Sequence, residues 1–163
     1  SIGDITQGGI IFYLDPSGKH GLVSALTDQH NGNGATWYNS ADTNGSVNDP
    51  FVDTRAYGSG LFEGKYNTKV INWSQGGSTS AAAICAAYTG GSFNDWYLPS
   101  IEELNKMYLN LHQQGLGGFA IYYYWSSTEV GNFDAWYQGF DVGGQFDFGY
   151  KNFNAIVRAV RAF

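Results

Sequence analysis

The chain has 163 residues, 43% of them hydrophobic, and a net charge of -6 from 14 acidic and 8 basic side chains. This length is enough for one domain with its own core, and the acidic balance excludes the basic surface usual in nucleic-acid-binding proteins. The single cysteine excludes an internal disulfide and a cysteine-based metal cluster. We expect Cys85 to be a small buried thiol.

No apolar run reaches the roughly 18 residues of a membrane span, so we expect no membrane insertion by this chain. The chain begins at Ser1 rather than at a methionine. We therefore treat it as a piece of a longer protein, in which other regions could hold an anchor or form an oligomer.

The first third of the chain predicts a hairpin followed by loops. Residues 10–14 form a buried strand, residues 15–18 its turn and residues 21–26 the return strand. Residues 29–77 are rich in Asn, Gly, Asp and Ser, which predicts long ordered loops without regular elements, held by single aromatic anchors. The expected anchors are Trp37, Phe51, Tyr57, Phe62 and Trp73.

Two helices are predicted next. Residues 78–80 can cap the first, whose apolar side chains recur at helical spacing at Ala81, Ile84, Cys85 and Tyr88. The second begins with a capping box formed by Ser100 and Glu103 and ends near Gly115. Its apolar stripe consists of Ile101, Leu104, Tyr108 and Leu111.

From Phe119 onward the apolar residues alternate with a period of two. Turn residues at 131–132 and 143–144 separate the strands of a meander, and residues 157–161 alternate as well, so we place them in the same terminal sheet. The order of hairpin, loops, two helices and sheet predicts an α+β domain over residues 1–163.

No arrangement of catalytic or metal-binding side chains emerges from the chain. Glu103 has a capping role and Glu102 lies in the same first turn, which disfavours a catalytic pair. Ser126 and Ser127 lack a nucleophile elbow and a nearby histidine. The histidines lack metal-ligand spacing, at His20, His30 and His112. We expect no enzyme and no cofactor.

A calcium site is a further alternative in residues 28–53, where Asp42, Asp49 and Asp53 offer carboxylates. No twelve-residue calcium-loop pattern is present there, and we expect no metal.

The segment from Val130 to Ile156 has the composition of a recognition surface. It is crowded with Phe, Tyr, Gly, Asp and Asn and holds one cation, Lys151, which disfavours a phosphate or anionic-polysaccharide partner. Aromatic residues supply contact area at low entropic cost, and small polar residues supply adaptable hydrogen bonds. The candidate ligand-binding residues are Phe133, Asp134, Tyr137, Asp141, Phe146, Asp147, Phe148, Tyr150, Phe153 and Asn154.

Strand alternation divides this segment into contacts and support. It places Phe146, Phe148 and Tyr150 on one face and Asp147 on the other. If the first face belongs to the core, these three aromatic residues are structural. We expect the platform below the contacts to consist of Trp125, Trp136 and Phe140.

Several blocks of sequence carry a family resemblance. The most specific are residues 95–100, Asp-Trp-Tyr-Leu-Pro-Ser, and residues 124–129, Tyr-Trp-Ser-Ser-Thr-Glu. With residues 8–14, 18–23, 67–68, 103–104 and 157–161, they resemble bacterial and phage domains of the Lcl C-terminal type. The resemblance runs nearly end to end, is weakest over residues 29–63, and implies a C-type-lectin-like fold. The tripeptides with which sugar-binding C-type lectins hold calcium and sugar, Glu-Pro-Asn or Gln-Pro-Asp with Trp-Asn-Asp, do not occur here.

A narrower resemblance is to the variable proteins of diversity-generating retroelements. In these systems a reverse transcriptase miscopies template adenines and replaces codons near the C-terminus. Asparagine codons altered in this way do not yield Trp, Gln, Lys, Glu or Met. Between Val130 and Ile156 only Trp136, Gln138, Gln145 and Lys151 lie outside the reachable set. The resemblance implies a variable-type region over about residues 124–163, with these residues as fixed positions.

The function implied is a non-enzymatic ligand- or receptor-binding module at a phage tail tip or on a bacterial surface. Its partner would be a protein or glycan receptor on a cell surface, and not a nucleic acid. Two alternatives remain open: an adhesin with fixed glycan specificity, and a structural domain that trimerises or caps a fibre.

Overall fold

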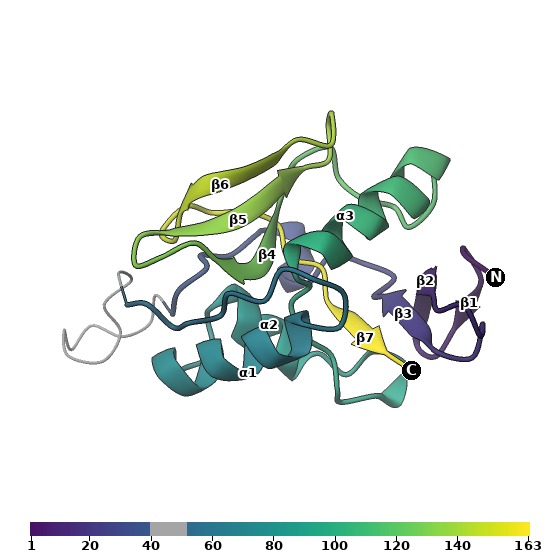
Figure 1. Ribbon diagram of the computed structural model, residues 1–163, viewed down its shortest axis with the longest axis horizontal. Helices are drawn as coiled ribbons and strands as arrows, with labels where there is room; N and C mark the ends of the chain where they lie inside the picture. The colour runs from purple at the N-terminus through teal and green to yellow at the C-terminus, as the bar shows by residue number, and fades with distance from the viewer. Residues whose placement is uncertain (40–51) are drawn as a thin grey trace.

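The computed structural model describes residues 1–39 and 52–163. These residues form two antiparallel sheets and three α-helices, which confirms the α+β class (Figure 1). The helices are α1 (Gly64–Gln75), α2 (Ala81–Ala87) and α3 (Ile101–Asn110). Short 3-10 turns span His30–Gly32, Gly90–Ser92 and His112–Gln114.

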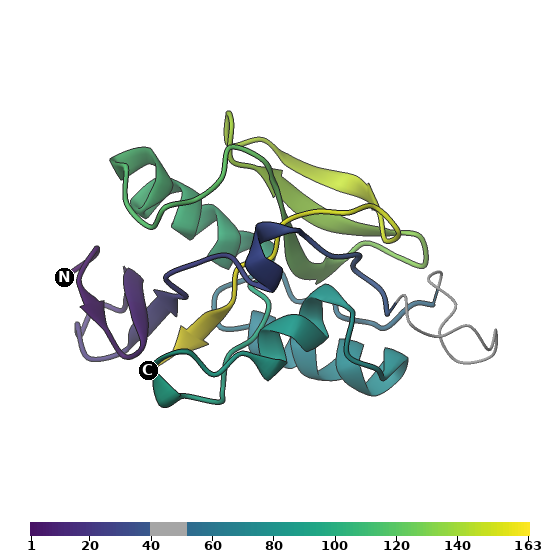
Figure 2. The ribbon, with the colours of Figure 1, turned by 180° about the vertical axis from the view of Figure 1, so that it is seen from behind.

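The first sheet has the order β1-β2-β3-β7, from Ile5–Thr6, Gly9–Leu14, Gly21–Ser24 and Val160–Ala162. The predicted N-terminal hairpin is confirmed as β2 and β3. The placement of residues 157–161 in the terminal meander was wrong, because β7 pairs with β3, with Leu22 opposite Ala162. The two termini therefore lie at the same end of the molecule, as both views show (Figures 1 and 2).

The second sheet has the order β4-β5-β6, from Tyr123–Glu129, Asp134–Gly139 and Gln145–Tyr150. It confirms the predicted meander up to Tyr150. Figure 1 shows this sheet at the top of the molecule, with α1 and α2 below it and α3 beside it. After β6 the chain runs back under the sheet to β7 (Figure 2).

Both predicted helices are present with their predicted caps. The Ser80 hydroxyl accepts a hydrogen bond from the Ala83 amide at the start of α2. At the start of α3, Ser100 accepts from the Glu103 amide, and the Glu103 carboxylate accepts from the Ser100 amide. These reciprocal bonds satisfy amides that have no partner inside the helix.

Helix α1 lies in the segment for which we predicted only loops, so that expectation was wrong. Its buried positions include polar residues, among them Asn67 and Thr68, and the apolar stripe of an ordinary amphipathic helix is therefore interrupted. Tertiary contacts replace the stripe: the Asn67 amide bonds both backbone groups of Gly58, and the Thr68 hydroxyl accepts from the Leu98 amide at 2.9 Å.

The predicted aromatic anchors behave differently from one another. Trp37 is fully buried, and its indole nitrogen donates to the Ser126 carbonyl at 2.8 Å. Tyr57, Phe62 and Trp73 are exposed, so the anchor role was wrong for them. Phe51 and the calcium candidates Asp42 and Asp49 lie outside the described residues.

Two apolar clusters cover the two faces of the β4-β5-β6 sheet. One contains Trp125 and Ala135, together with Trp37 and the helix α2 residues. The other contains Tyr124 and Phe140, packed on the α3 residues Leu104, Met107 and Tyr108. The sheet is therefore fixed from both sides over part of its area, and the remainder reaches the surface.

Candidate ligand-binding surface

The base of the candidate surface is Trp125 of β4. Its side chain is fully buried, and its indole nitrogen donates to the Ala35 carbonyl at 3.0 Å. Tyr137 of β5 lies opposite Trp125 in the register, and their rings meet edge to face at 5.9 Å. Gly149 of β6 leaves the space that these rings need, because a Cβ there would lie 2.6 Å from Tyr137 and 2.8 Å from Trp125.

A group of aromatic side chains lies over this base, and we call it the aromatic face. The rings of Tyr137 and Phe146 stack at 5.1 Å, Tyr123 meets Tyr137 at 5.3 Å, and Phe146 meets Phe148 at 5.6 Å. The outer members are 61% exposed at Phe148, 49% at Tyr122 and 38% at Phe153. The aromatic face consists of Tyr122, Tyr123, Tyr137, Phe146, Phe148 and Phe153.

The alternation predicted for β6 placed Phe146, Phe148 and Tyr150 on one face, which was wrong for Tyr150. The register between β5 and β6 shifts between Ala135 and Tyr137, which is the mark of a bulge. Phe146 and Phe148 both contact Tyr137, as predicted for residues on one face. Tyr150 pairs instead with Asp134, whose side chain points to the opposite face from Ala135 and Tyr137.

The candidate contact residues fall into separate groups. Tyr137, Phe146, Phe148 and Phe153 gather on the aromatic face. Phe133, Asp134 and Tyr150 lie at the end of the β5-β6 pair that is remote from its turn, whereas Asp141 lies in that turn. Asp147 is exposed on β6, and Asn154 is exposed beside Phe153.

The expected platform is present only in part. Trp125 and Phe140 are fully buried, as predicted, but Phe140 packs on the α3 side of the sheet and not below the aromatic face. Trp136 is half-buried, so its assignment to the core was wrong. Its strand position places it on the face opposite Tyr137, and its carbonyl accepts the hydroxyl of Ser126 at 2.7 Å.

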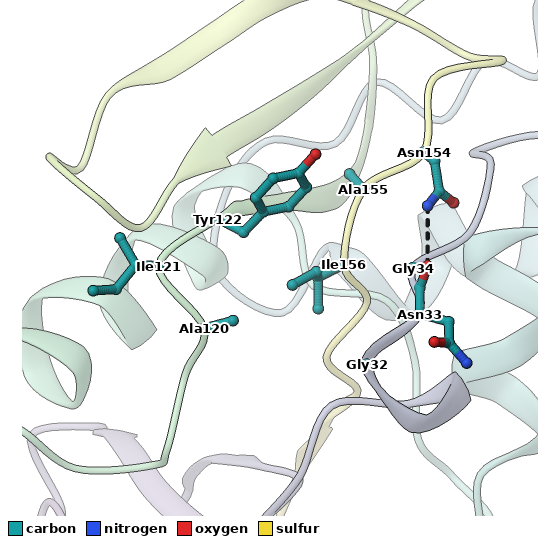
Figure 3. Close-up of a pocket in the computed structure, with 9 residues that line it drawn as sticks. All are labelled: Gly32, Asn33, Gly34, Ala120, Ile121, Tyr122, Asn154, Ala155 and Ile156. Carbon is teal, nitrogen blue, oxygen red and sulfur yellow. Dashed lines mark hydrogen bonds between the residues drawn. The ribbon is translucent and has the colours of Figure 1, made fainter.

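A hollow of about 450 Å³ adjoins the aromatic face. Figure 3 shows residues 120–122 on one side of it, residues 32–34 on the other and residues 154–156 between them. The Asn154 amide nitrogen donates to the Asn33 carbonyl at 3.0 Å and so ties the C-terminal segment to the 32–34 loop. Tyr122 belongs to both the hollow and the aromatic face, which makes the two continuous.

Sequence reasoning missed Asn33, Tyr122 and Tyr123 as parts of this surface. Tyr122 and Tyr123 precede the segment of unusual composition, and their exposure depends on where β4 begins. The run of tyrosines at 122–124 was the available signal. Asn33 carried no signal, because its place beside Asn154 results from the antiparallel bridge between Ala35 and Ala155.

Lys151, the one cation between Lys106 and Arg158, does not reach the surface. It is fully buried, forms an ion pair with Glu129 and lies over the Trp37 ring at 4.8 Å. Burial lowers the pKa of Lys151, although Glu129 opposes this shift. The Glu129 carboxylate also accepts from the amide and hydroxyl of Thr54, so the charge pair lies within a hydrogen-bonded network.

Gln138 is another polar residue fixed in the interior. Its side chain is fully buried and donates to Asn105 Oδ1 at 2.9 Å and to the Gly143 carbonyl at 3.1 Å. These bonds connect β5 to helix α3 and to the β5-β6 turn. Gln145 makes a similar connection, donating to the Ile101 carbonyl at 3.2 Å.

The remaining titratable groups have structural surroundings. Burial raises the pKa of Glu103 to about 7, while its carboxylate accepts from Ser100, Phe62 and Tyr97. Cys85 is buried as predicted, and burial raises the pKa of its thiol well above the ordinary value. In the part of the chain that is described, no group of three or more His, Cys, Asp or Glu side chains is placed to hold a metal.

No helix within residues 1–39 and 52–163 is long and apolar enough to span a membrane. No curated protein matches the chain. Its structure is similar to that of a fimbrial protein from Bacteroides ovatus ATCC 8483, with a TM-score of 0.52 and 18% sequence identity. The similarity covers 86% of this chain and 35% of that protein. The sequence model of the Lcl C-terminal domain matches residues 26–161, and the chain therefore belongs to the Lcl C-terminal domain family.

Proposed function

We propose that this chain is a non-enzymatic ligand- or receptor-binding module displayed outside the cell, with the aromatic face as its contact surface. The observation that carries the proposal is the exposure of Phe148, Tyr122 and Phe153 in one connected group of rings. Tyr123 contacts both Tyr122 and Phe153, and Tyr137 contacts Phe148, Phe153 and the fully buried Trp125. Contiguous exposed aromatic surface marks interaction sites, and buried aromatic anchors dominate binding energy in protein interfaces.

The comparisons support an extracellular setting for this function. The structural neighbour is named as a fimbrial protein, and fimbriae are surface appendages. This chain corresponds to 35% of that neighbour's length, which fits one module within a longer surface protein. A bacterial surface protein and a phage tail tip are both compatible with such a module.

The finer form of the proposal is a variable protein of a diversity-generating retroelement, with a C-type-lectin-like domain as its scaffold. Its support is the contrast between the two kinds of position after Val130. Of the four residues that altered asparagine codons cannot produce, Gln138 and Lys151 are fully buried and bonded, whereas Trp136 is half-buried and Gln145 is exposed. The candidate contact residues are all at least partly exposed, and each is of a type that an altered asparagine codon can encode.

Flanking DNA tests this finer form directly. We expect a reverse-transcriptase gene near the coding sequence, and a near-copy of codons 124–163 that differs at adenines. Absence of both from the complete locus would contradict the retroelement hypothesis. The proposal would then be an adhesin of fixed specificity.

Alanine substitutions test the binding function itself. Fluorescently labelled wild-type chain, Phe148→Ala and Phe153→Ala would be applied to a panel of bacterial and animal cells, with thermal unfolding of each protein measured in parallel. We expect both variants to lose binding while the unfolding midpoint changes little. Trp73→Ala is the matched control, because Trp73 is 88% exposed and lies on α1.

Full binding by both aromatic-face variants would contradict the proposal. An equal loss in Trp73→Ala would also contradict it, since the contact would then not be confined to the aromatic face.

A further inference from the structure

We infer that the hollow beside the aromatic face binds the end of an uncharged oligosaccharide, with the following sugar units lying on the aromatic face. This inference rests on the proposed function and names the ligand class for the same surface. The hollow's volume of about 450 Å³ falls within the usual range of small-ligand sites.

The lining of the hollow suits hydroxyl groups. Among the described residues, the side-chain amide of Asn33, the Oδ1 atom of Asn154 and the hydroxyl of Tyr122 make no hydrogen bond. An amide and a phenol both donate and accept, as sugar hydroxyls do. Figure 3 shows these side chains on three different segments, with Tyr122 across from residues 154–156 and the Asn33 amide turned away from residues 120–122.

The aromatic face continues the site in one direction. Tyr122 contacts Tyr123 at 5.5 Å, and Tyr123 contacts Tyr137 at 5.3 Å and Phe153 at 6.3 Å. Faces of aromatic rings carry partial negative charge and attract the partly positive C–H groups of a sugar ring. A chain of sugars leaving the hollow would therefore meet a ring at each step.

An extended peptide fits this place less well than a sugar. Peptides that bind beside a strand add main-chain hydrogen bonds to a free sheet edge. Here the edge of β4 is occupied by Ile156, which donates to the Tyr123 carbonyl at 2.9 Å and accepts from the Trp125 amide at 3.0 Å. The hollow therefore offers side-chain groups rather than a strand edge.

The charges of the surface favour an uncharged ligand over a sulfated or acidic one. Lys151 is buried against Glu129, and Arg158 is buried against Asp28. His30, two residues before Gly32 of the hollow, has its Nδ1 atom bonded to the Gly34 carbonyl at 2.7 Å. Asp147, exposed on β6 near Phe148, adds negative charge that would repel an anionic chain.

A glycan array tests the inference. The probes are uncharged hexose and N-acetylhexosamine oligosaccharides, printed beside sulfated and sialylated counterparts, and the best binders are measured by calorimetry. We expect binding to uncharged oligosaccharides, and about tenfold weaker binding by Asn154→Ala and by Tyr122→Phe, each of which removes a hydrogen bond to the ligand. Asn132→Ala, an exposed asparagine in the β4-β5 turn, is the matched control and should bind like wild type.

Two results would overturn the inference. One is tighter binding of charged than of uncharged oligosaccharides, and the other is unchanged affinity in both hollow variants. If no oligosaccharide binds but cells are bound through Phe148, the ligand is a protein. The oligosaccharide inference is then wrong, and the proposed binding function is retained. If neither cells nor oligosaccharides are bound, both proposals fall.

Discussion

The two faces of the β4-β5-β6 sheet differ in how tightly their side chains are held. On the face against α3, Tyr124, Gln138 and Phe140 are fully buried. On the aromatic face, Tyr137 and Phe146 are half-buried and Phe148 is mostly exposed. Successive residues of one strand serve the two faces in turn. A sheet of this kind can keep its fold through one set of positions while the neighbouring set changes with the ligand.

The largest effect should come from the ion pair that lies beneath the surface. Lys151→Ala would leave the Glu129 charge buried without its partner, and loss of one partner of a buried pair costs about 3–5 kcal/mol. Urea unfolding measures this loss. Asn152→Ala, the exposed neighbour, should change the unfolding free energy by less than about 0.5 kcal/mol. A loss below about 1 kcal/mol for Lys151→Ala would show that the pair does not hold this region.

The next effect is a pH dependence of the unfolding free energy, and it concerns Glu103 of helix α3, which covers the face opposite the aromatic face. Burial raises the pKa of Glu103 from its ordinary value of 4.5 to about 7, so the folded chain binds more protons than the unfolded chain between these values. This contribution to stability is complete below pH 4.5 and is lost as the pH rises through 7, by at most about 3 kcal/mol.

Unfolding free energies at pH 5 and pH 8 would measure this difference. Glu103→Gln should remove the Glu103 part of the decrease, whereas Glu102→Gln, which changes an exposed side chain in the same turn, should keep it. Equal pH dependence in wild type and Glu103→Gln would contradict the assignment.

Substitution of two neighbouring tyrosines, Tyr124 and Tyr123, compares the two faces of the sheet most directly. The Tyr124 hydroxyl accepts from the Ala120 amide at 2.8 Å and donates to Asp28. Tyr124→Phe removes the acceptor of the half-buried Ala120 amide and one of the two partners of Asp28, which keeps Arg158, and should cost about 1–3 kcal/mol. Tyr123→Phe, on the aromatic face, should cost less than about 0.5 kcal/mol. Equal losses of unfolding free energy, measured by urea unfolding, would contradict the difference between the two faces.

A small effect on stability is also expected for Phe148→Ala, the most exposed member of the aromatic face. The side chain is 61% exposed and contacts the rings of Tyr137 and Phe146. We expect a loss below about 1 kcal/mol, since little buried area disappears. Thermal unfolding checks this value. A larger loss would place Phe148 with the structural residues and weaken its use as a binding probe.

The elements that could be predicted from the sequence are those defined by near neighbours. The capping box of Ser100 and Glu103, the Ser80 cap and the β2-β3 hairpin each depend on residues a few positions apart. Helix α1 was missed because tertiary bonds of Asn67 and Thr68 stabilise it in place of an apolar stripe. Local sequence patterns do not predict hydrogen bonds to residues that are distant in the chain.

The candidate surface was predictable as a composition but not as a geometry. Phe146, Phe148 and Phe153 were recognised as contact candidates, yet the bulge that turns Tyr150 away from them has no clear sequence signature. The hollow could not be predicted, because residues 32–34, 120–122 and 154–156 meet only through long-range pairing.

The sequence by itself determined the starts of α2 and α3, the N-terminal hairpin, the meander and the aromatic, cation-poor character of residues 130–156. Only the tertiary structure decided that β7 joins the first sheet, that Lys151 is buried against Glu129, and that Trp136 is half-exposed. The physical reason is the range of the interactions. Caps and alternation arise between residues near in the chain, whereas strand order and burial arise from packing between segments that are far apart in it.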